Sequence, residues 1–224
     1  MSGWHADQGI AEAGTSLAEA AGAVVLLHGR GATAGSILGL TSVLGRHDLT
    51  YRAPQARGGT WYPDRFVAPF EHNEPALSSA LAVVGGVLDD LEAEGVEPER
   101  TVLLGFSQGA CLALESAVRR PRRYGAVIAW SGGLIGPPAT EWPARGAFDG
   151  APVFLGCSDV DPHVPLWRVE ESAKVFQSQG AAVDRRIYPG FGHGVNDDEI
   201  GAAKVLLEGV AGQGARGDST APVG

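Results

Sequence analysis

Short, continuous apolar runs alternate along the chain with longer segments whose apolar residues recur at helical spacing. Runs of this kind, rich in β-branched and aliphatic residues, are typical of strands buried on both faces. The predicted strands cover residues 23–28, 49–53, 101–104, 125–131, 152–157 and 183–188. The predicted helices cover residues 37–44, 75–94, 110–120, 167–179 and 195–211. Strands that alternate with helices predict an α/β fold whose mostly parallel central sheet is covered by helices on both faces.

The two ends of the chain carry weaker patterns. Residues 1–22 have no regular periodicity, and residues 17–21 fit either a short edge strand or a turn. No internal repeat or change in composition divides the rest of the chain, so we expect a single domain over residues 1–211. Residues 212–224 lack apolar periodicity, and we expect a disordered tail there.

Composition and charge narrow the class of protein. The 224-residue chain is 44% hydrophobic and 19% charged, and its formal net charge is −9. This acidic balance, without a long basic run, argues against a nucleic-acid partner. The two cysteines, Cys111 and Cys157, lie in apolar runs and are expected to be buried and reduced. Residues 1–13 do not form a targeting signal and residues 20–27 are too short to cross a bilayer, so we expect a cytoplasmic protein without an integral membrane part.

Segments rich in polar and glycine residues follow five of the predicted strands. Parallel strands end at the same edge of a sheet, and open α/β sheets bind their ligands beyond that edge. These segments are therefore expected to meet and to form a site. They are residues 28–32, 55–62, 107–108, 158–165 and 189–194.

One of these segments belongs to the pattern Gly-x-Ser-x-Gly, at Gly105, Ser107 and Gly109. The pattern stands between a predicted strand and a predicted helix, which is the context of a nucleophile on a sharp turn. Such a turn crowds the backbone at Ser107, so the positions two residues away must lack side chains. It also sets the serine hydroxyl at a helix N-terminus, where developing negative charge is favoured. Ser107 is therefore the candidate nucleophile.

A serine nucleophile needs an adjacent base, and the base needs a group that orients it. On this architecture the expected order along the chain is serine, carboxylate and histidine. His193 lies in the glycine-rich segment after the last predicted strand and is the candidate base, whereas His163 stands beside the candidate acids. Asp161 is preferred as the acid because the proline that follows it holds its backbone extended. Asp159 remains the alternative.

Negative charge that develops on a substrate carbonyl oxygen requires two hydrogen-bond donors. We expect the backbone N–H of Gln108, the residue after the nucleophile, and that of Arg30, in the loop after the first buried strand. Gly29 and Gly31 allow that loop to fold tightly, and His28 is expected to support it by hydrogen bonding rather than to act as a base. The sequence contains no cluster that resembles a zinc site, and this chemistry needs neither a metal nor a cofactor.

Aromatic and aliphatic residues on the predicted loops suggest a shallow apolar cleft for an acyl group. These loop residues are not part of the periodic core, which makes them candidates for substrate binding. For Trp61, a place in the core is an equally good interpretation. No long insertion supplies a lid. The candidate cleft residues are Trp61, Phe66, Leu134 and Phe191.

Six motifs occur along the chain in order: His28-Gly29-Arg30-Gly31, Ala53-Pro54-Gln55, Trp61-Tyr62, Gly105-Phe106-Ser107-Gln108-Gly109, Asp159-Val160-Asp161-Pro162-His163-Val164-Pro165 and Gly192-His193. Together they resemble the small phospholipase/carboxylesterase family of α/β-hydrolases, whose best-known members are acyl-protein thioesterases. The resemblance covers about residues 22–210 and implies an α/β-hydrolase fold without a large lid. It implies Ser107, Asp161 and His193 as the catalytic triad, which favours Asp161 over Asp159. It also implies the amides of Arg30 and Gln108 as the oxyanion hole.

One motif departs from the family's usual pattern. Acyl-protein thioesterases typically carry a leucine and an aspartate around the second glycine of the oxyanion loop, where this chain has Arg30 and Ala32. The arginine version resembles a bacterial branch of hydrolases, some of them linked to hydroquinone or quinone compounds. Two interpretations of the Arg30 side chain stay open: it faces the pocket and favours an anionic or polar acyl group, or it forms a surface salt bridge.

The resemblance implies a serine carboxylic-ester hydrolase that acts on small to medium acyl esters through an acyl-enzyme. An acyl-thioesterase or lysophospholipase is the nearest alternative, and a non-catalytic binding protein with the hydrolase fold is an alternative from another class. An acyltransferase or perhydrolase that uses the same triad is a third. The expected partner is a small-molecule ester or thioester, and the sequence leaves the choice between monomer and homodimer open.

Overall fold

The computed structural model describes residues 3–142 and 147–214. Its centre is a seven-stranded sheet in the order β1-β3-β2-β4-β5-β6-β7. All neighbouring strands are parallel except β1 and β3, which pair antiparallel at one edge. The strands are β1 (Ile10–Gly14), β2 (Ala23–Leu27), β3 (Thr50–Pro54), β4 (Thr101–Phe106), β5 (Ala126–Trp130), β6 (Pro152–Ser158) and β7 (Ala182–Tyr188).

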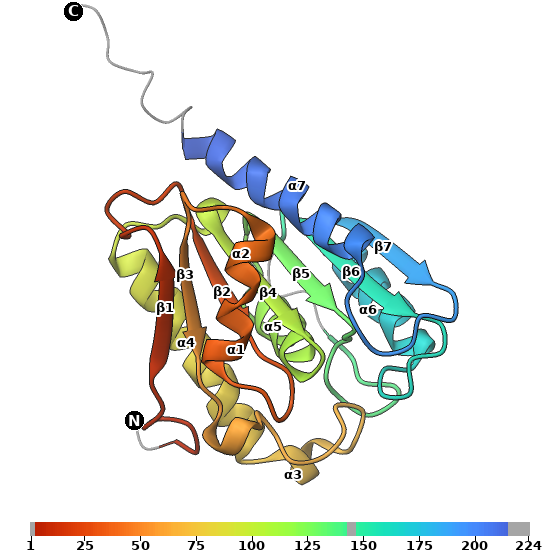
Figure 1. Ribbon diagram of the computed structural model, residues 1–224. Coiled ribbons are helices and arrows are strands. Elements are labelled where there is room, and N and C mark those ends of the chain that lie inside the picture. The colour runs from red at the N-terminus through yellow and green to blue at the C-terminus, as the bar shows by residue number, and fades with distance from the viewer. Residues whose placement is uncertain (1–2, 143–146, 215–224) are drawn as a thin grey trace, which may run out of the picture.

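Helices cover both faces of this sheet (Figure 1). Helices α1, α2 and α7 lie on one face, and α4, α5 and α6 lie on the other. This arrangement confirms the predicted α/β fold with a mostly parallel sheet. The helices are α1 (Ala34–Leu38), α2 (Leu40–Leu44), α3 (Phe70–Asn73), α4 (Ala76–Ala93), α5 (Gln108–Arg119), α6 (Leu166–Ser178) and α7 (Asp197–Gly214), with short 3-10 turns η1 (Arg57–Gly59) and η2 (Pro98–Arg100).

Each face of the sheet carries its own apolar core. In β2, Val24 and Leu26 pack under the helices of one face, while Val25 and Leu27 pack under those of the other. Successive side chains of a strand point to opposite faces, so a strand covered on both sides must be apolar throughout. Burying each such side chain contributes about 1.5–3 kcal/mol. The continuous apolar runs were therefore a sound guide to the central strands.

The structure decides between two alternatives for one predicted segment and corrects two other details of the predicted elements. Of the two alternatives for residues 17–21, the structure has the turn, at residues 17–19. The strand at this edge of the sheet is β1, whose residues are all at least partly exposed and which therefore lacks a continuous apolar run. The helix predicted over residues 37–44 is divided at Gly39 into α1 and α2. Helix α7 continues to Gly214, so the first three residues of the predicted tail are helical. The remaining tail residues lie outside the described part of the chain, and the single domain stays a prediction.

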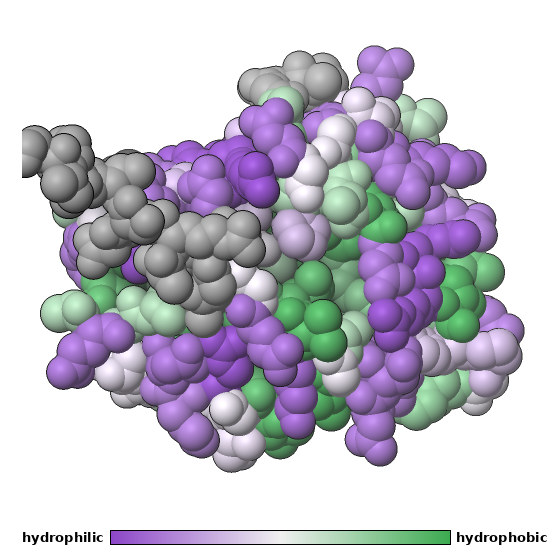
Figure 2. Space-filling model, turned by 90° about the horizontal axis from the view of Figure 1, so that it is seen from above, coloured by the Kyte–Doolittle hydropathy of each residue, from purple (hydrophilic) through white to green (hydrophobic). Residues whose placement is uncertain are grey.

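In residues 3–142 and 147–214, no helix combines the length and apolar character needed to cross a bilayer. On the face seen from above in Figure 2, hydrophilic side chains surround smaller hydrophobic areas. The carboxyl ends of the parallel strands meet at the opposite, lower edge of the sheet in Figure 1. The candidate chemical groups gather at that lower edge.

Candidate active site

Ser107 stands on a sharp turn between the end of β4 and the start of α5. Its backbone has φ +54° and ψ −119°, a conformation that residues other than glycine rarely adopt. A Cβ atom at Gly105 would collide with the carbonyl oxygen of Gly109, and one at Gly109 would collide with that of Leu27. The close approach of Gly105 to the first turn of α5, and of Gly109 to the end of β2, therefore requires glycine at both positions of the sequence pattern.

The three predicted catalytic side chains lie in one chain of hydrogen bonds. His193 Nε2 lies 2.9 Å from Ser107 Oγ, and His193 Nδ1 lies 2.7 Å from Asp161 Oδ2. Because a carboxylate only accepts hydrogen bonds, the network assigns the ring proton to Nδ1 and leaves Nε2 as the acceptor for the serine hydroxyl. In this geometry a histidine can take the proton of a serine.

Both carboxylate oxygens of Asp161 are occupied by donors. Oδ1 accepts from the N–H groups of His163 and Val164 at 2.8 and 3.0 Å, and Oδ2 faces the Cys157 thiol at 3.8 Å as well as His193. Burial by itself would raise the pKa of Asp161. The hydrogen bonds from His193 and the two backbone N–H groups outweigh burial, and the pKa of Asp161 lies below its ordinary value. The carboxylate therefore stays ionised beside the imidazole.

The alternative acid has a different partner. Asp159 is exposed, and its Oδ1 accepts from the N–H of Gly190 at 2.8 Å rather than from the imidazole.

Two rings contact the imidazole of His193. The ring of His163 lies edge-on to it at 4.8 Å between centroids, and the ring of Phe106 lies at 5.1 Å from it between centroids. From the sequence we expected His163 to be a neighbour of the acid. We gave no role to Phe106, although Phe106 directly precedes Ser107.

The loop after β2, residues 28–32, is called the oxyanion loop below, and it folds against the nucleophile. The Ala32 N–H donates to the carbonyl of Gly29 at 3.1 Å and closes a tight turn around Arg30. A Cβ atom at Gly29 would lie 3.5 Å from that of Ser107, which shows how closely the loop approaches. Gln108 begins α5, so its N–H has no acceptor within the helix. Arg30 and Gln108 line the same cavity as Ser107.

His28 supports the oxyanion loop from the interior. Its fully buried ring donates from Nδ1 to the carbonyl of Gly29 at 2.8 Å and accepts at Nε2 from the N–H of Ala56 at 3.1 Å. Burial lowers the pKa of His28, so the ring is neutral at neutral pH and offers one donor and one acceptor. These contacts agree with the supporting role that the sequence suggested.

The Arg30 side chain makes contacts that the sequence did not indicate. Its guanidinium donates to the carbonyl oxygens of Tyr62, Pro63 and Asp64 at 3.0, 2.7 and 2.7 Å. These three residues border the cavity, in a segment, residues 61–66, that is called the wall loop below. The guanidinium is therefore a strap between the oxyanion loop and the wall loop, and it forms no salt bridge with any residue that the structure describes.

The side chain of Gln108 holds the same wall loop from the other side. Its Oε1 accepts from the N–H of Trp61 at 2.9 Å, and its Nε2 donates to the carbonyl of Tyr62 at 2.7 Å. The sequence assigned a role only to the backbone amide of Gln108. The role of the side chain in holding the wall loop becomes visible only in the tertiary structure.

Ser107 opens into a cavity of about 590 Å³. The lining residues Tyr62, Phe66 and Cys111 are buried, whereas the charged residues Arg30 and Arg65 are exposed. The cavity thus combines an apolar, buried lining with exposed charges. Its volume suits a small organic ligand. Of the four predicted cleft residues, Phe66 lines this cavity.

Trp61 lies elsewhere. The indole is 0% exposed and is not among the residues that line the cavity. Its Nε1 donates to the carbonyl of His28 at 2.9 Å, and its ring contacts the rings of His5 and His28 at centroid distances of 5.6 and 5.0 Å. Trp61 is therefore a core residue behind the oxyanion loop, as the alternative interpretation of the sequence proposed.

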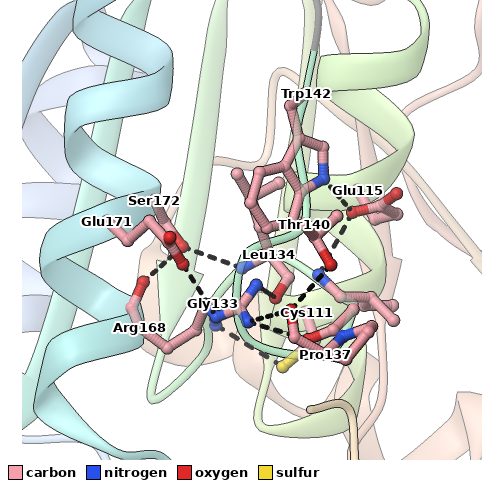
Figure 3. A network of polar contacts seen from close by, with 12 residues as sticks. Cys111, Glu115, Gly133, Leu134, Pro137, Thr140, Trp142, Arg168, Glu171 and Ser172 are labelled. Carbon is pink, nitrogen blue, oxygen red and sulfur yellow. Dashed lines mark hydrogen bonds and ion pairs between the residues drawn. The ribbon is translucent and has the colours of Figure 1, made fainter. Parts of the chain in front are cut away.

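Leu134 and Phe191 also lie away from the cavity lining. Leu134 is buried in a polar network: its N–H donates to Ser172 Oγ at 2.8 Å and its carbonyl accepts from Arg168 at 3.3 Å (Figure 3). The buried side chains of Arg168 and Glu115 hold the loop after β5 in this network. Phe191 is 47% exposed and packs against its own loop. An apolar loop residue turns inward or outward according to its tertiary neighbours, which the sequence pattern does not contain.

Neither cysteine is suited to nucleophilic chemistry. Cys111 and Cys157 are buried free thiols, and burial raises the pKa of each to about 12. A thiol with such a pKa is protonated at neutral pH, and the thiolate is the reactive form. Within the described ranges, no group of three or more His, Cys, Asp or Glu side chains is placed to hold a metal ion.

Comparison with known proteins gives a consistent set of similarities. The model of the phospholipase/carboxylesterase family matches residues 9–210. Acyl-protein thioesterase 1 of Saccharomyces cerevisiae is 33% identical over 110 residues, which are 48% of this chain and 48% of that protein. The chain thus matches about half the length of this curated relative.

Two solved structures are similar over nearly the whole fold. The crystal structure of a phospholipase/carboxylesterase from Dyadobacter fermentans is 42% identical, with a TM-score of 0.88, and the match covers 93% of this chain and 99% of that one. The crystal structure of esterase PE8 is 27% identical, with a TM-score of 0.74, and the match covers 91% of this chain and 99% of that one.

Proposed function

The chain belongs to the phospholipase/carboxylesterase family, and from this membership we propose that it is a serine hydrolase of carboxylic esters. Its fold is the α/β-hydrolase fold that the resemblance implied. The observation that carries the proposal is the continuous hydrogen-bonded chain from Ser107 through His193 to Asp161 at the wall of a cavity. A nucleophile, a base and an orienting carboxylate in this order are what acyl transfer requires.

The first half of the proposed reaction acylates the enzyme. Ser107 Oγ attacks the substrate carbonyl carbon while His193 Nε2 takes the hydroxyl proton. The negative charge that forms on the carbonyl oxygen is stabilised by the backbone N–H groups of Arg30 and Gln108. Asp161 stabilises the imidazolium that forms. The imidazolium then protonates the leaving alkoxide, and the acyl group remains on the serine.

The second half releases the acid. Water takes the place of the alcohol, His193 removes its proton, and the resulting hydroxide attacks the acyl carbon. The same two amides receive the oxyanion, and the proton returns from His193 to Ser107 Oγ as the acid leaves. Every proton passes through His193 Nε2, so this half-reaction requires no metal or cofactor.

We assign small to medium acyl esters as the substrate class. The support is the size of the cavity, about 590 Å³, and the buried, largely apolar lining formed by Tyr62, Phe66 and Cys111. A second candidate is thioester or lysophospholipid hydrolysis, because the yeast relative is named an acyl-protein thioesterase and the family is described as phospholipase/carboxylesterase. The oxyanion loop of this chain carries Arg30 where thioesterases typically carry leucine, which favours the ester assignment. A cytoplasmic location is part of the proposal, supported by two free, buried cysteines.

Covalent labelling tests the proposal directly. The wild-type protein is treated with a fluorophosphonate probe, and the Ser107→Ala variant serves as the control. We expect stoichiometric labelling of the wild type and none of the variant, with both folded by circular dichroism. Folded wild-type protein that neither takes up the label nor hydrolyses any ester would instead indicate a non-catalytic binding protein.

Kinetics on matched substrates separate the candidate reactions. p-Nitrophenyl esters and acyl-thioesters of increasing acyl length are compared by kcat/KM. Higher kcat/KM for the esters at short and medium lengths supports the proposal, whereas a preference for thioesters reassigns the substrate class. Product analysis with added alcohol or peroxide identifies an acyltransferase or a perhydrolase.

A further inference from the structure

The loop that carries His193, residues 189–194, has little rigidity of its own. It contains Gly190, Gly192 and Gly194, and the first two have φ +69° and +84°. Glycine has the largest conformational freedom in the unfolded state, so ordering such a loop needs contacts from outside it. A base that must stay within hydrogen-bond distance of both Ser107 and an acid requires such contacts.

One hydroxyl group joins this loop to the loop that carries the acid. Ser158 Oγ accepts from the N–H of Gly192 at 3.0 Å and from the N–H of Val160 at 3.2 Å. Gly192 directly precedes His193, and Val160 directly precedes Asp161. The same oxygen atom is therefore bonded to the residue before the base and to the residue before the acid.

The position of Ser158 in the sheet holds its hydroxyl group in place between the two loops. The residue is the last of β6 and is 2% exposed, so the sheet fixes its backbone and water has little access to its hydroxyl. Its contact with Val160 is local, but its contact with Gly192 joins residues 34 positions apart. Ser158 is absent from the lining of the cavity. Any effect it has on the reaction must therefore pass through the two loops.

Two further side chains hold the same loop on either side of His193. Asp159 Oδ1 accepts from the N–H of Gly190 at 2.8 Å. Ser131 Oγ donates to the carbonyl of Gly194 at 3.2 Å. Every second residue of the loop is thus tied to a side chain from the ends of β5 or β6, which leaves His193 between two fixed glycines.

We propose that Ser158 is a positioning residue that sets His193 and Asp161 in register with each other. The inference rests on the proposed function, because it concerns the base and acid of that reaction. Without the hydroxyl, two N–H groups lose their acceptor and the His193 loop loses its bond to β6. The 2.7 Å contact between His193 Nδ1 and Asp161 Oδ2 then lengthens and fluctuates.

The expected consequence is a loss of turnover rather than of binding. A misplacement of about 1 Å in a catalytic group costs on the order of 10²-fold in rate. We therefore expect Ser158→Ala to lower kcat and the rate of fluorophosphonate labelling by about 10- to 100-fold. The KM for a p-nitrophenyl ester should stay within about twofold of the wild-type value, because Ser158 does not line the cavity.

Two variants control this experiment. Ser158→Cys fills the same space with a weak acceptor, so it should lose activity in the same direction even if Ser158→Ala fails to fold. Ser178→Ala removes an exposed hydroxyl whose one hydrogen bond to a described residue goes to the carbonyl of Val175 in its own helix, and it should behave as the wild type. Wild-type labelling rates in folded Ser158→Ala and Ser158→Cys would overturn the proposal. A rise in KM as large as the fall in kcat would overturn it too.

Proton NMR provides a readout that needs no turnover. The Nδ1 proton of His193 in its short bond to Asp161 should give a downfield resonance in the wild type and in Ser178→Ala. We expect this resonance to broaden or shift upfield in Ser158→Ala and Ser158→Cys, and an unchanged resonance contradicts the proposal. If the wild type itself is neither labelled nor active, the proposed function fails, while the resonance still tests the geometric role of Ser158.

Discussion

The guanidinium of Arg30 donates a 2.7 Å hydrogen bond to the carbonyl oxygen of Pro63. This contact ties the oxyanion loop to the wall loop, so the residue that supplies one proposed oxyanion amide also supports one side of the cavity. Two further hydrogen bonds from the same guanidinium, to the carbonyl oxygens of Tyr62 and Asp64, fix the orientation of its planar group of N–H donors. Arg30, which stands where typical thioesterases carry leucine, thus supports the wall of the proposed acyl site.

The first prediction concerns Arg30→Lys. An ammonium group keeps the charge but cannot span three carbonyl oxygens as a planar fork does. Each lost hydrogen bond costs about 1 kcal/mol, so the wall loop loosens and KM for medium-length esters rises by about five- to tenfold. Steady-state kinetics over esters of increasing acyl length measure this change. Arg185→Lys, at an exposed ion pair with Glu170, is the matched control, and identical KM profiles for the two variants would refute the strap.

The second prediction separates Trp61 from substrate binding. Trp61→Phe removes the bond from Nε1 to the carbonyl of His28 and leaves a small void in the core. We expect the free energy of unfolding to fall by about 1–3 kcal/mol. The dependence of KM on acyl length should stay the same, because the indole does not line the cavity. Urea denaturation and ester kinetics test both parts, and Trp4→Phe, at a 49% exposed side chain, is the control.

The third prediction distinguishes the two carboxylates after β6. Asp161→Asn takes the charged acceptor away from His193 Nδ1, and its amide N–H group favours the wrong ring tautomer. A loss of about 10³- to 10⁴-fold in kcat is expected. Asp159→Asn keeps an oxygen acceptor for the N–H of Gly190 and should lose far less. Comparing kcat of the two variants decides the matter, and a greater loss in Asp159→Asn would point to Asp159 as the acid.

The fourth prediction concerns pH and stability through Glu199. The side chain is 1% exposed, and one of its oxygens, Oε1, has no hydrogen-bond partner among the described residues. Burial raises the pKa of Glu199 from 4.5 to about 7. The folded protein therefore binds a proton that the unfolded chain releases at lower pH. Stability falls as pH rises from about 4.5 to 7, and the full penalty is present above pH 7.

Glu199→Gln removes this penalty, since the neutral amide needs no proton. We expect the variant to gain about 1–3 kcal/mol in the free energy of unfolding at pH 8 relative to the wild type, and little at pH 4. Urea denaturation at both pH values measures the difference. Glu208→Gln, at an exposed position of the same helix, should change stability equally at both. If Glu199→Gln changed the free energy of unfolding equally at both pH values, the predicted cost of ionising the buried Glu199 carboxyl would be contradicted.

The features that were predicted correctly depend mainly on neighbours in the chain. The buried strand β2 could be found because a strand covered on both faces must be apolar throughout. The strand β1 has no such apolar run, because each of its residues is at least partly exposed, and it was not predicted. The turn at Ser107 could be found because its close approaches to other backbone atoms demand glycine at fixed spacing. Features of this kind can be predicted because a short stretch of sequence determines them.

The sequence by itself therefore determined the type of fold and which serine, aspartate and histidine are candidates for one site. Only the tertiary structure decided where Trp61 and Leu134 lie, what the guanidinium of Arg30 holds and that Ser158 joins two loops. The physical reason is that these side chains respond to partners far away in the chain. Arg30 meets Pro63 across 33 positions and Ser158 meets Gly192 across 34, and no local pattern of residues encodes such contacts.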